Sequence, residues 1–428
     1  IFLKNLFLYT MSQSGDEILD DRLAEILRNH ESLTSIDISW RYIGDEGAKL
    51  LVEMLCVNKS ITKIDLKNNN IGNEGAKALA EGLHVNKTIN SIDLSFNQIG
   101  DEGAKALSKA LFLNKSICTI IMNCSKIGKE GVEALAEMLL VNNSITSIAL
   151  HRNNIGEDGA TALAKALRVN KSIKSVNLGS NKLGNEGTKL LAEALLVNDT
   201  LSSIDLSWNQ ICVKGAKAFS RALRVNKSLT MINLKGNKIE QQGAKALAEA
   251  LRLNKFITSI NLGFNHVGDQ GVIEIAKALL FNDSIQEIRL DGNHVGCDGA
   301  EAFAETLRAN KSIHSIYWGD AHIDYGAAKA LAEALRINYT LLKFHLSKPP
   351  FKTEMKKLIK RNELLQWKNQ HAILLDVCIA MQSLELPAYV LLWIYDQFGL
   401  GEASINQFKK ISLIESTINS VRGVKRAR

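Results

Sequence analysis

Three histidines recur at one position of the sequence, 28 residues apart: His266, His294 and His322. Neutral imidazole is a common metal ligand and titrates near physiological pH, so a ladder of such rings could bind a metal or act as a pH-sensitive patch. In other copies the same position holds different polar residues, namely Asn70, Gln98, Lys126 and Gln210. We therefore predict an exposed polar column without a metal, and keep a metal site as the alternative.

No other set of residues has the composition of a catalytic site. The glycine-rich turns, such as Ile99 to Gly103, lack a following Lys-Ser/Thr and carry acids where a phosphate would need hydrogen-bond donors. No Walker A motif occurs in the sequence. We predict that the chain is not an enzyme, and that it has no catalytic residues and no cofactor.

The histidine spacing reflects a repeat that covers most of the chain. Blocks of 28 residues follow one another from residue 33 to about residue 346, as in Ser144–Lys171 and Ser172–Asp199. Each block begins with alternating apolar residues, the spacing of a strand, and continues after a turn with apolar residues at helical spacing, such as Leu247 and Leu251. A period of this length indicates a stacked array whose units share one core.

The strand half of each block follows the pattern LxxLxLxxN, as at Leu201 to Asn209. With this pattern the chain resembles a leucine-rich repeat protein of the ribonuclease-inhibitor class, a type also found in NOD-like receptors and Ran GTPase-activating proteins. The resemblance implies an α/β solenoid shaped like a horseshoe, with a concave parallel sheet and convex helices. A small all-α region would follow it.

Three columns of identical residues have structural interpretations. The first is an asparagine that can satisfy backbone groups where the chain leaves the sheet, at Asn69, Asn97, Asn153, Asn181, Asn209, Asn237, Asn265 and Asn293. The second is a glycine expected in a crowded turn just before each helix, from Gly75 to Gly299. The third is the asparagine of ten Asn-x-Ser/Thr sequons, which we expect to end the helices in the left-handed conformation.

The compartment follows from the sequons and the cysteines. Glycans at ten stacked helix ends would crowd the array, so the sequons are interpreted as caps. The six cysteines show no paired spacing, which predicts reduced and mostly buried side chains. Both observations favour an intracellular, cytoplasmic protein.

The chain divides into four segments. Residues 1–10 are apolar but too short to span a membrane, and we expect them to be non-native or disordered, because the first methionine is Met11. Residues 11–32 are expected to form an N-terminal capping helix, 33–348 the repeats, and 349–428 a helical cap or appendage. Of the net charge of +7, an excess of +5 lies in residues 349–428, so the nearly neutral array is not expected to bind nucleic acid.

Function is expected on the concave face, at the variable positions of the strand pattern, because these point away from the core. One column holds aromatic residues, which we interpret as lying at solvent-facing strand positions. A neighbouring column holds aspartates. Together they predict two acidic-aromatic patches that bind a protein partner. The predicted partner-binding residues are Trp40, Phe96, Trp208, Phe264, Asp37, Asp65, Asp93, Asp205, Arg152, Arg289 and Tyr317.

The C-terminal region offers a second interpretation. Leu386 to Phe398 resembles the opening helix of an F-box, which implies a substrate adaptor of a cullin-type ubiquitin ligase docking through Leu386, Pro387, Val390, Leu391 and Ile394. A departure from the F-box pattern is Tyr389, which stands where that pattern has an acid. The main prediction is a non-enzymatic scaffold or receptor for a protein partner; the alternatives are the ligase adaptor and a Ran-GAP-like GTPase regulator.

Overall fold

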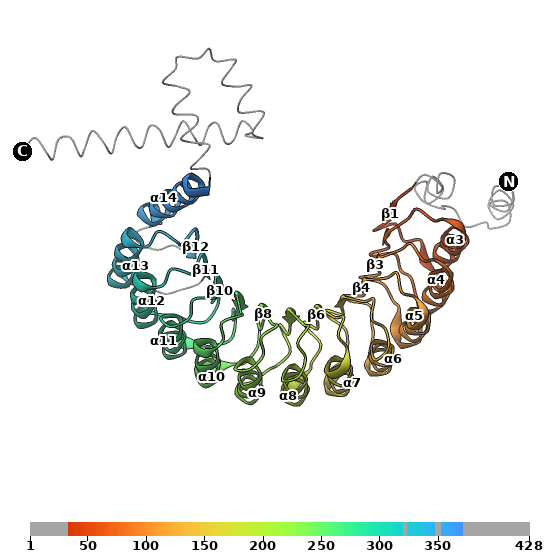
Figure 1. Cartoon of the computed structure of the whole chain (residues 1–428), viewed down its shortest axis with the longest axis horizontal. Coiled ribbons are helices and arrows are strands. Elements are labelled where there is room, and N and C mark those ends of the chain that lie inside the picture. The colour runs from red at the N-terminus through yellow and green to blue at the C-terminus, as the bar shows by residue number, and fades with distance from the viewer. Residues whose placement is uncertain (1–32, 320–322, 347–351, 371–428) are drawn as a thin grey trace, which may run out of the picture.

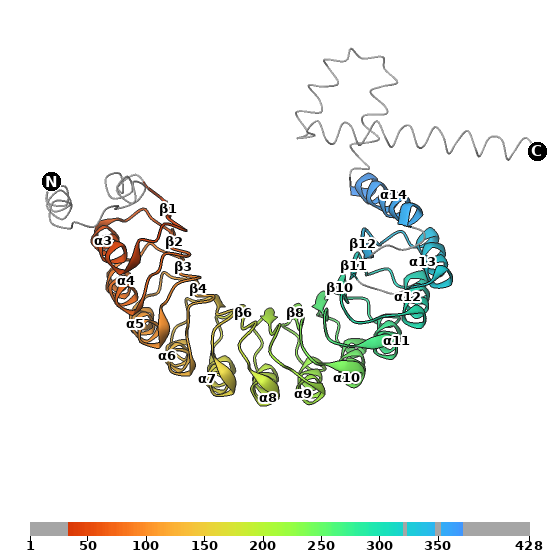
Figure 2. The same cartoon turned by 180° about the vertical axis from the view of Figure 1, so that it is seen from behind.

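The computed structural model describes residues 33–319, 323–346 and 352–370. Within them the chain forms a horseshoe whose strands line the inner rim and whose helices form the outer one (Figures 1 and 2). The short strands are β1 (Ser35–Asp37), β2 (Lys63–Asp65), β3 (Ser91–Asp93), β4 (Thr119–Ile121), β5 (Ser147–Ala149), β6 (Ser175–Asn177), β7 (Ser203–Asp205), β8 (Met231–Asn233), β9 (Ser259–Asn261), β10 (Glu287–Arg289), β11 (Ser315–Trp318) and β12 (Lys343–Leu346).

A helix follows every strand. The helices are α3 (Gly44–Val57), α4 (Asn73–Val85), α5 (Gly100–Leu113), α6 (Lys129–Leu139), α7 (Gly156–Val169), α8 (Gly184–Leu195), α9 (Val213–Leu223), α10 (Glu240–Leu253), α11 (Gly268–Leu279), α12 (Cys297–Ala309), α13 (Tyr325–Ile337) and α14 (Lys352–Gln370). The strands form one parallel sheet in the order β1 to β12, each paired with the next. The register is set by the repeat, so Ile64 lies beside Ile92, 28 residues on.

The core lies between the sheet and the helices. In β7 and the residue after it, Ile204 and Leu206 are buried, and they share one apolar cluster with Phe219 and Leu223 of α9. The alternate residues Ser203 and Asp205 remain partly exposed on the inner rim. The alternation predicted from the sequence is therefore confirmed, and it leaves one side chain in two free of the core.

The first asparagine column joins each repeat to its neighbours, as the sequence predicted. Asn209 is buried, and its Oδ1 accepts hydrogen bonds from the backbone N–H groups of Asn181 (2.9 Å) and Leu183 (3.3 Å) in the preceding repeat. Its Nδ2 donates to the carbonyl oxygens of Leu178 (2.8 Å) and Ser207 (3.1 Å). One side chain thus satisfies backbone groups of two repeats in a place that water does not reach.

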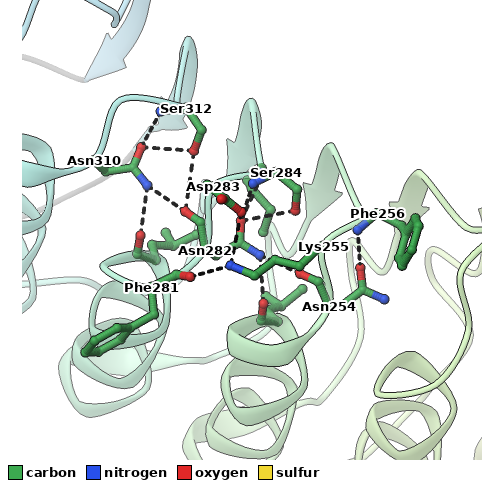
Figure 3. A network of polar contacts seen from close by, with 12 residues as sticks. Asn254, Lys255, Phe256, Phe281, Asn282, Asp283, Ser284, Asn310 and Ser312 are labelled. Atoms are coloured by element: carbon green, nitrogen blue, oxygen red, sulfur yellow. Dashed lines mark hydrogen bonds and ion pairs between the residues drawn. The ribbon is translucent and has the colours of Figure 1, made fainter.

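The sequon asparagines form a second ladder, at the ends of the helices. Asn310 donates from Nδ2 to the carbonyl oxygens of Leu279 (2.8 Å) and Asn282 (2.9 Å), while its Oδ1 accepts from the N–H groups of Ser312 and Ile313 (Figure 3). The prediction of a left-handed conformation here was wrong, because Asn310 is extended, with φ −70° and ψ 134°. The extended backbone is what lets the amide reach into the preceding repeat. All ten asparagines of this helix-end column are buried.

The glycine column lies in the first turn of helices α4 to α12, not before the helix as predicted. The crowding that we expected is present, because a Cβ on Gly103 would approach Cβ of Ala76 to 2.8 Å and Cγ2 of Ile99 to 2.9 Å. Glycine therefore allows adjacent helices to approach at this level.

The N-termini of several helices are capped from the preceding repeat, which the sequence analysis did not foresee. Oδ1 of Asp101, in α5, accepts hydrogen bonds from the N–H groups of Gly128 (2.6 Å) and Gly131 (2.9 Å) at the start of α6. Asp269 binds Gly296 and Gly299 of the following repeat in the same way. A negative charge near a helix N-terminus also complements the helix dipole.

Helix α14 continues the second ladder beyond the last strand. Nδ2 of Asn362 donates to the carbonyl oxygens of Asn338 (3.0 Å) and Leu341 (2.8 Å), and the Arg361 guanidinium donates to that of Leu335 (2.9 Å). Met355 is buried against the core. The helix begins at Lys352, and Leu365 on it is exposed.

The cysteines are less buried than predicted. Cys56, Cys118, Cys124, Cys212 and Cys297 are free thiols of intermediate exposure. Cys378 lies outside the described residues, as do residues 1–32 and the F-box-like segment.

We predict that Asn209→Ala lowers the free energy of unfolding by about 2–4 kcal/mol, because it leaves buried N–H groups of Asn181 and Leu183 without partners. Urea unfolding followed by circular dichroism measures this. The adjacent exposed residue gives the control, since Gln210→Ala should change stability by less than about 0.5 kcal/mol. Equal effects of the two substitutions would contradict the ladder's role.

Candidate functional site

An aspartate column runs along the first three strands on the inner rim. Asp37, Asp65 and Asp93 are direct register partners in β1, β2 and β3. Each Oδ1 accepts a hydrogen bond from the backbone N–H two residues further on, at 3.1, 3.0 and 2.8 Å respectively. Neighbouring parallel strands lie about 4.8 Å apart, so three like charges stand close together.

The pKa of the middle aspartate, Asp65, is shifted by its surroundings. Partial burial raises the pKa of Asp65 above its usual value, and the repulsion of Asp93 and Asp37 adds to this, against the hydrogen bond from Lys67. The native state therefore binds more protons than the unfolded chain between the two pKa values, and stability falls as the pH rises through that interval. Ionised Asp65 thus destabilises the fold at neutral pH.

The aromatic residues do not occupy strand positions, which corrects the sequence interpretation. Trp40, Phe96, Trp208 and Phe264 follow the strands and have left-handed φ angles of 64°, 59°, 55° and 55°. They keep one ladder hydrogen bond, as from the Trp208 N–H to the Lys235 carbonyl oxygen at 2.7 Å. Their side chains are 58, 43, 50 and 40% exposed. They therefore lie at the edge where the chain leaves the sheet.

From Trp40 to Gly292 the column shares this backbone conformation, with large and small residues in alternation. Between the large residues stand Asn68, Cys124, Ser180, Gly236 and Gly292. A left-handed conformation is unfavourable by about 1–2 kcal/mol for residues with a Cβ, and glycine avoids this. Two repeats have glycine at this position. The turn therefore does not itself require an aromatic residue there.

The glycines make room for the rings. A Cβ on Gly236 would lie 2.5 Å from Cε2 of Trp208, and one on Gly292 would lie 2.6 Å from Cδ1 of Phe264. Each ring therefore lies across the backbone of the following repeat. As a result Trp208 reaches Phe264 two repeats away, with ring centroids 6.1 Å apart and planes tilted by 34°.

These rings border a groove at the turn edge of β7 to β10, with a volume of about 770 Å³. Lys235 places its Nζ 5.0 Å from the centroid of the Phe264 ring. The imidazoles of His266 and His294 stack on each other at 5.7 Å. We call this the Trp208 groove; its lining residues are Trp208, Gln210, Gly236, Asn237, Lys238, Phe264, His266, Gly292 and His294.

The two predicted patches differ in charge. At the N-terminal one, Asp37 and Asp93 precede Trp40 and Phe96 by three residues, and Lys67 lies 5.2 Å over the Phe96 ring. At the second one, the lining residues include no carboxylate. The nearby Asp205 is hydrogen-bonded within the protein, since its Oδ2 accepts a hydrogen bond from Asn233 at 2.8 Å.

A third cluster lies on the last strands. The Arg289 guanidinium lies 4.2 Å over the Tyr317 ring, which stacks in turn on His345 at 4.6 Å. Arg289 also pairs with Glu287 at 2.7 Å. The structure therefore places two predicted residues, Arg289 and Tyr317, in contact. It adds His345, which is in the same column but was not predicted from the sequence.

Some predicted residues lie outside the described part of the chain. These are His322 and the docking residues Leu386, Pro387, Val390, Leu391 and Ile394. Arg152 is exposed in the aromatic column with φ 54°. Among residues 33–319, 323–346 and 352–370, no cluster of three His, Cys, Asp or Glu could hold a metal, and no helix could span a membrane.

The repeats are leucine-rich repeats. The model of the family described as "Leucine Rich repeat" matches seven segments, residues 57–80, 85–108, 141–164, 169–192, 197–220, 225–248 and 253–276. Together with the single parallel sheet and its row of helices, this identifies the fold as a leucine-rich repeat solenoid.

Several solved structures share parts of this shape. One is titled "Leiomodin-1 Actin-Binding Site 2 (ABS2)", with 20% identity, 50% of this chain and 93% of that chain covered, and a TM-score of 0.29. The crystal structure of a TLR13–ssRNA13 complex has 16% identity, coverage of 68% and 36%, and a TM-score of 0.43. The tropomodulin C-terminal domain of Caenorhabditis elegans has 16% sequence identity and a TM-score of 0.30. The match covers 42% of this chain and 92% of that one. These similarities concern the fold alone. No curated protein matches the sequence.

We predict that Asp65→Asn raises the free energy of unfolding at pH 7 by about 0.2–1 kcal/mol, because it removes a partly buried charge that two neighbouring carboxylates also repel. The gain should vanish below about pH 3.9, where the unfolded carboxyl is also protonated. Denaturant unfolding at both pH values measures it.

Asp199 provides the control of opposite sign. A hydrogen bond from Lys171 lowers the pKa of Asp199, so its charge stabilises the fold above the unfolded pKa, and this is lost as the pH falls. Asp199→Asn should bring no gain at pH 7. A loss of stability at pH 7 in Asp65→Asn would show that the aspartate column is not under repulsion.

Proposed function

We propose that this chain is a non-enzymatic scaffold or receptor that holds a protein partner against its concave face. Leucine-rich repeats generally mediate protein–protein interaction, which the family match brings to this chain. The observation that carries the proposal is the pair Trp208 and Phe264, half-exposed rings in contact with each other at the edge of the inner rim.

The rings have the properties of interface anchors. Large aromatic side chains supply much of the binding energy of protein interfaces when a partner buries them. Here they stand in a left-handed conformation that glycine would adopt more easily, and two glycines of the following repeats accommodate them. The fold gains little from this arrangement, which supports a role in binding.

The aspartate column supports the same proposal at the N-terminal end. Asp65 is kept at a cost to stability, as the upward shift of its pKa indicates. A partner with a basic side chain would relieve the repulsion among Asp37, Asp65 and Asp93. The N-terminal patch therefore suits a basic surface, and the stacked Arg289 and Tyr317 offer a further contact at the opposite end.

An intracellular, cytoplasmic location is part of the proposal. In the folded protein the asparagines of the ten helix-end sequons are buried, and Asn282 illustrates how both polar atoms are hydrogen-bonded, so they offer no free amide to a glycan. The five described cysteines are free thiols. Both features suit a reducing compartment.

We also propose the ribonuclease-inhibitor class for the repeats. The support is that each 28-residue unit pairs its strand with an α-helix, of 11 residues in α9 and 14 in α10. The Ran-GAP-like alternative draws no support from any described contact, and a Ran GTP turnover assay tests it.

The ubiquitin-ligase alternative rests on Leu386 to Phe398 alone. Capture of partners from cytosol should compare the full chain with a version ending at Gln370, which keeps α14 on the last repeat. Cullin and its Skp adaptor recovered only with the full chain would support the adaptor. The same partner recovered by both versions, without ligase components, would support a plain scaffold.

We predict that Trp208→Ala combined with Phe264→Ala abolishes capture of the partner and leaves the melting temperature within about 3 °C of the unsubstituted chain, because surface substitutions have small effects on stability. Affinity capture with mass spectrometry and thermal circular dichroism measure the two quantities.

The matched control is Phe112→Ala combined with Phe281→Ala, which removes rings 47 and 61% exposed, one in the last turn of α5 and one just after the end of α11. This variant should capture the partner normally. Normal capture by the Trp208 and Phe264 variant, or its unfolding, would contradict the proposed interface.

A further inference from the structure

We propose that the Trp208 groove binds an extended acidic-apolar segment of the partner, in which apolar side chains lie next to carboxylates. This inference rests on the proposed function and names the chemistry recognised at one part of the concave surface. It follows from the groove's floor, its charge and its length.

The floor of the groove is apolar and preformed. The Trp208 ring lies across Gly236 and the Phe264 ring across Gly292, so neither ring can settle closer to the backbone. The tilt of 34° between the rings leaves their faces partly open. The volume of about 770 Å³ is typical of a site that accepts a few side chains.

The rim of the groove has only positive or neutral polar groups. Lys238, His266 and His294 line it, and Lys235 stands over the Phe264 ring. Within the described chain, neither of these lysines forms an ion pair with a carboxylate, in contrast to Lys171 and Lys255 of the helix-end edge.

Three acids near the groove, Asp205, Asp269 and Asp291, are already hydrogen-bonded within the protein. Both oxygens of Asp205 accept hydrogen bonds, from Ser207 and from Asn233. Asp269 caps the start of α12, and Asp291 accepts a hydrogen bond from the Gly319 N–H at 2.8 Å. Since the lining of the groove includes no carboxylate, a carboxylate of the partner could pair with Lys238.

The length of the groove suits an extended segment. It crosses the ends of β7 to β10, three strand spacings of about 4.8 Å, or roughly 14 Å in all. An extended chain advances about 3.3 Å per residue, so about four residues span it. Single-stranded nucleic acid would also stack on rings, but it requires a denser basic track than two lysines in a nearly neutral array.

The test uses the full chain and fluorescein-labelled octapeptides in an anisotropy titration. The first peptide has two central leucines flanked by glutamates; in the second, glutamines replace the glutamates, and in the third, serines replace the leucines. We expect the first to bind at least tenfold more tightly than the others. An octauridylate probe tests the nucleic-acid alternative.

Two pairs of variants locate the binding. Lys238→Gln should weaken the first peptide three- to tenfold, whereas Lys182→Gln, at the same position two repeats earlier, should leave it unchanged. Trp208→Ala should remove binding, whereas Trp40→Ala should not. Each variant is checked by thermal circular dichroism, and the conservative Trp208→Phe should retain part of the affinity if Trp208→Ala fails to fold.

The inference is overturned if the first peptide does not bind, if the glutamine peptide binds as well, if Lys238→Gln has no effect, or if only the oligonucleotide binds. Partner capture that depends on Trp208 and Phe264 without peptide binding leaves the proposed function standing and removes this inference. Capture that is indifferent to both rings removes the proposed function, whatever the peptides do.

Discussion

The structure depends on asparagine side chains that satisfy the buried backbone of neighbouring repeats. Two ladders, one at the turn after each strand and one at the end of each helix, connect the repeats along the array. A buried backbone group without a partner is strongly unfavourable, so no repeat is complete without its neighbours. Asp101 and Asp269, which cap the helix of the following repeat, apply the same principle. The array is therefore held together by exchange between repeats as well as by its apolar core.

Because the core and the asparagine ladders stabilise the array, the exposed residues of the inner rim are available for binding. Ile204, Leu206 and their equivalents form the core, and the asparagines form the ladders. The remaining strand and turn residues therefore contribute little to the stability of the fold. The residues that occupy them are chemically distinct along the horseshoe. Aspartates lie at the first strands, the Trp208 groove lies at β7 to β10, and the stack on Arg289 lies at the last strands. A partner that follows the inner rim would meet these three surfaces in turn.

The sequence predicts the repeat, its strand and helix, and the first asparagine column, because these depend on local spacing. It does not predict the conformation of Trp208, because the strand pattern alone does not reveal where the backbone turns left-handed. Nor does it show that Gly236 and Gly292 lie beneath the rings, since that contact joins residues 28 apart in the chain. One signal was available: large and small residues alternate in this column from Trp40 to Gly292, with a period of two repeats. The extended backbone of Asn310 was missed for a similar reason, because its partners belong to the preceding repeat.

The proposed partner covers the inner rim of the horseshoe and not its helices. Hydroxyl-radical footprinting of the full chain, alone and with the captured partner, tests it directly, because exposed aromatic side chains are oxidised readily and each can be followed by mass spectrometry. We expect oxidation of Trp208 and Phe264 to fall severalfold in the complex, while that of Phe112 and Phe281 stays the same. Protection of Phe112 and Phe281 with no change at Trp208 and Phe264 would contradict it.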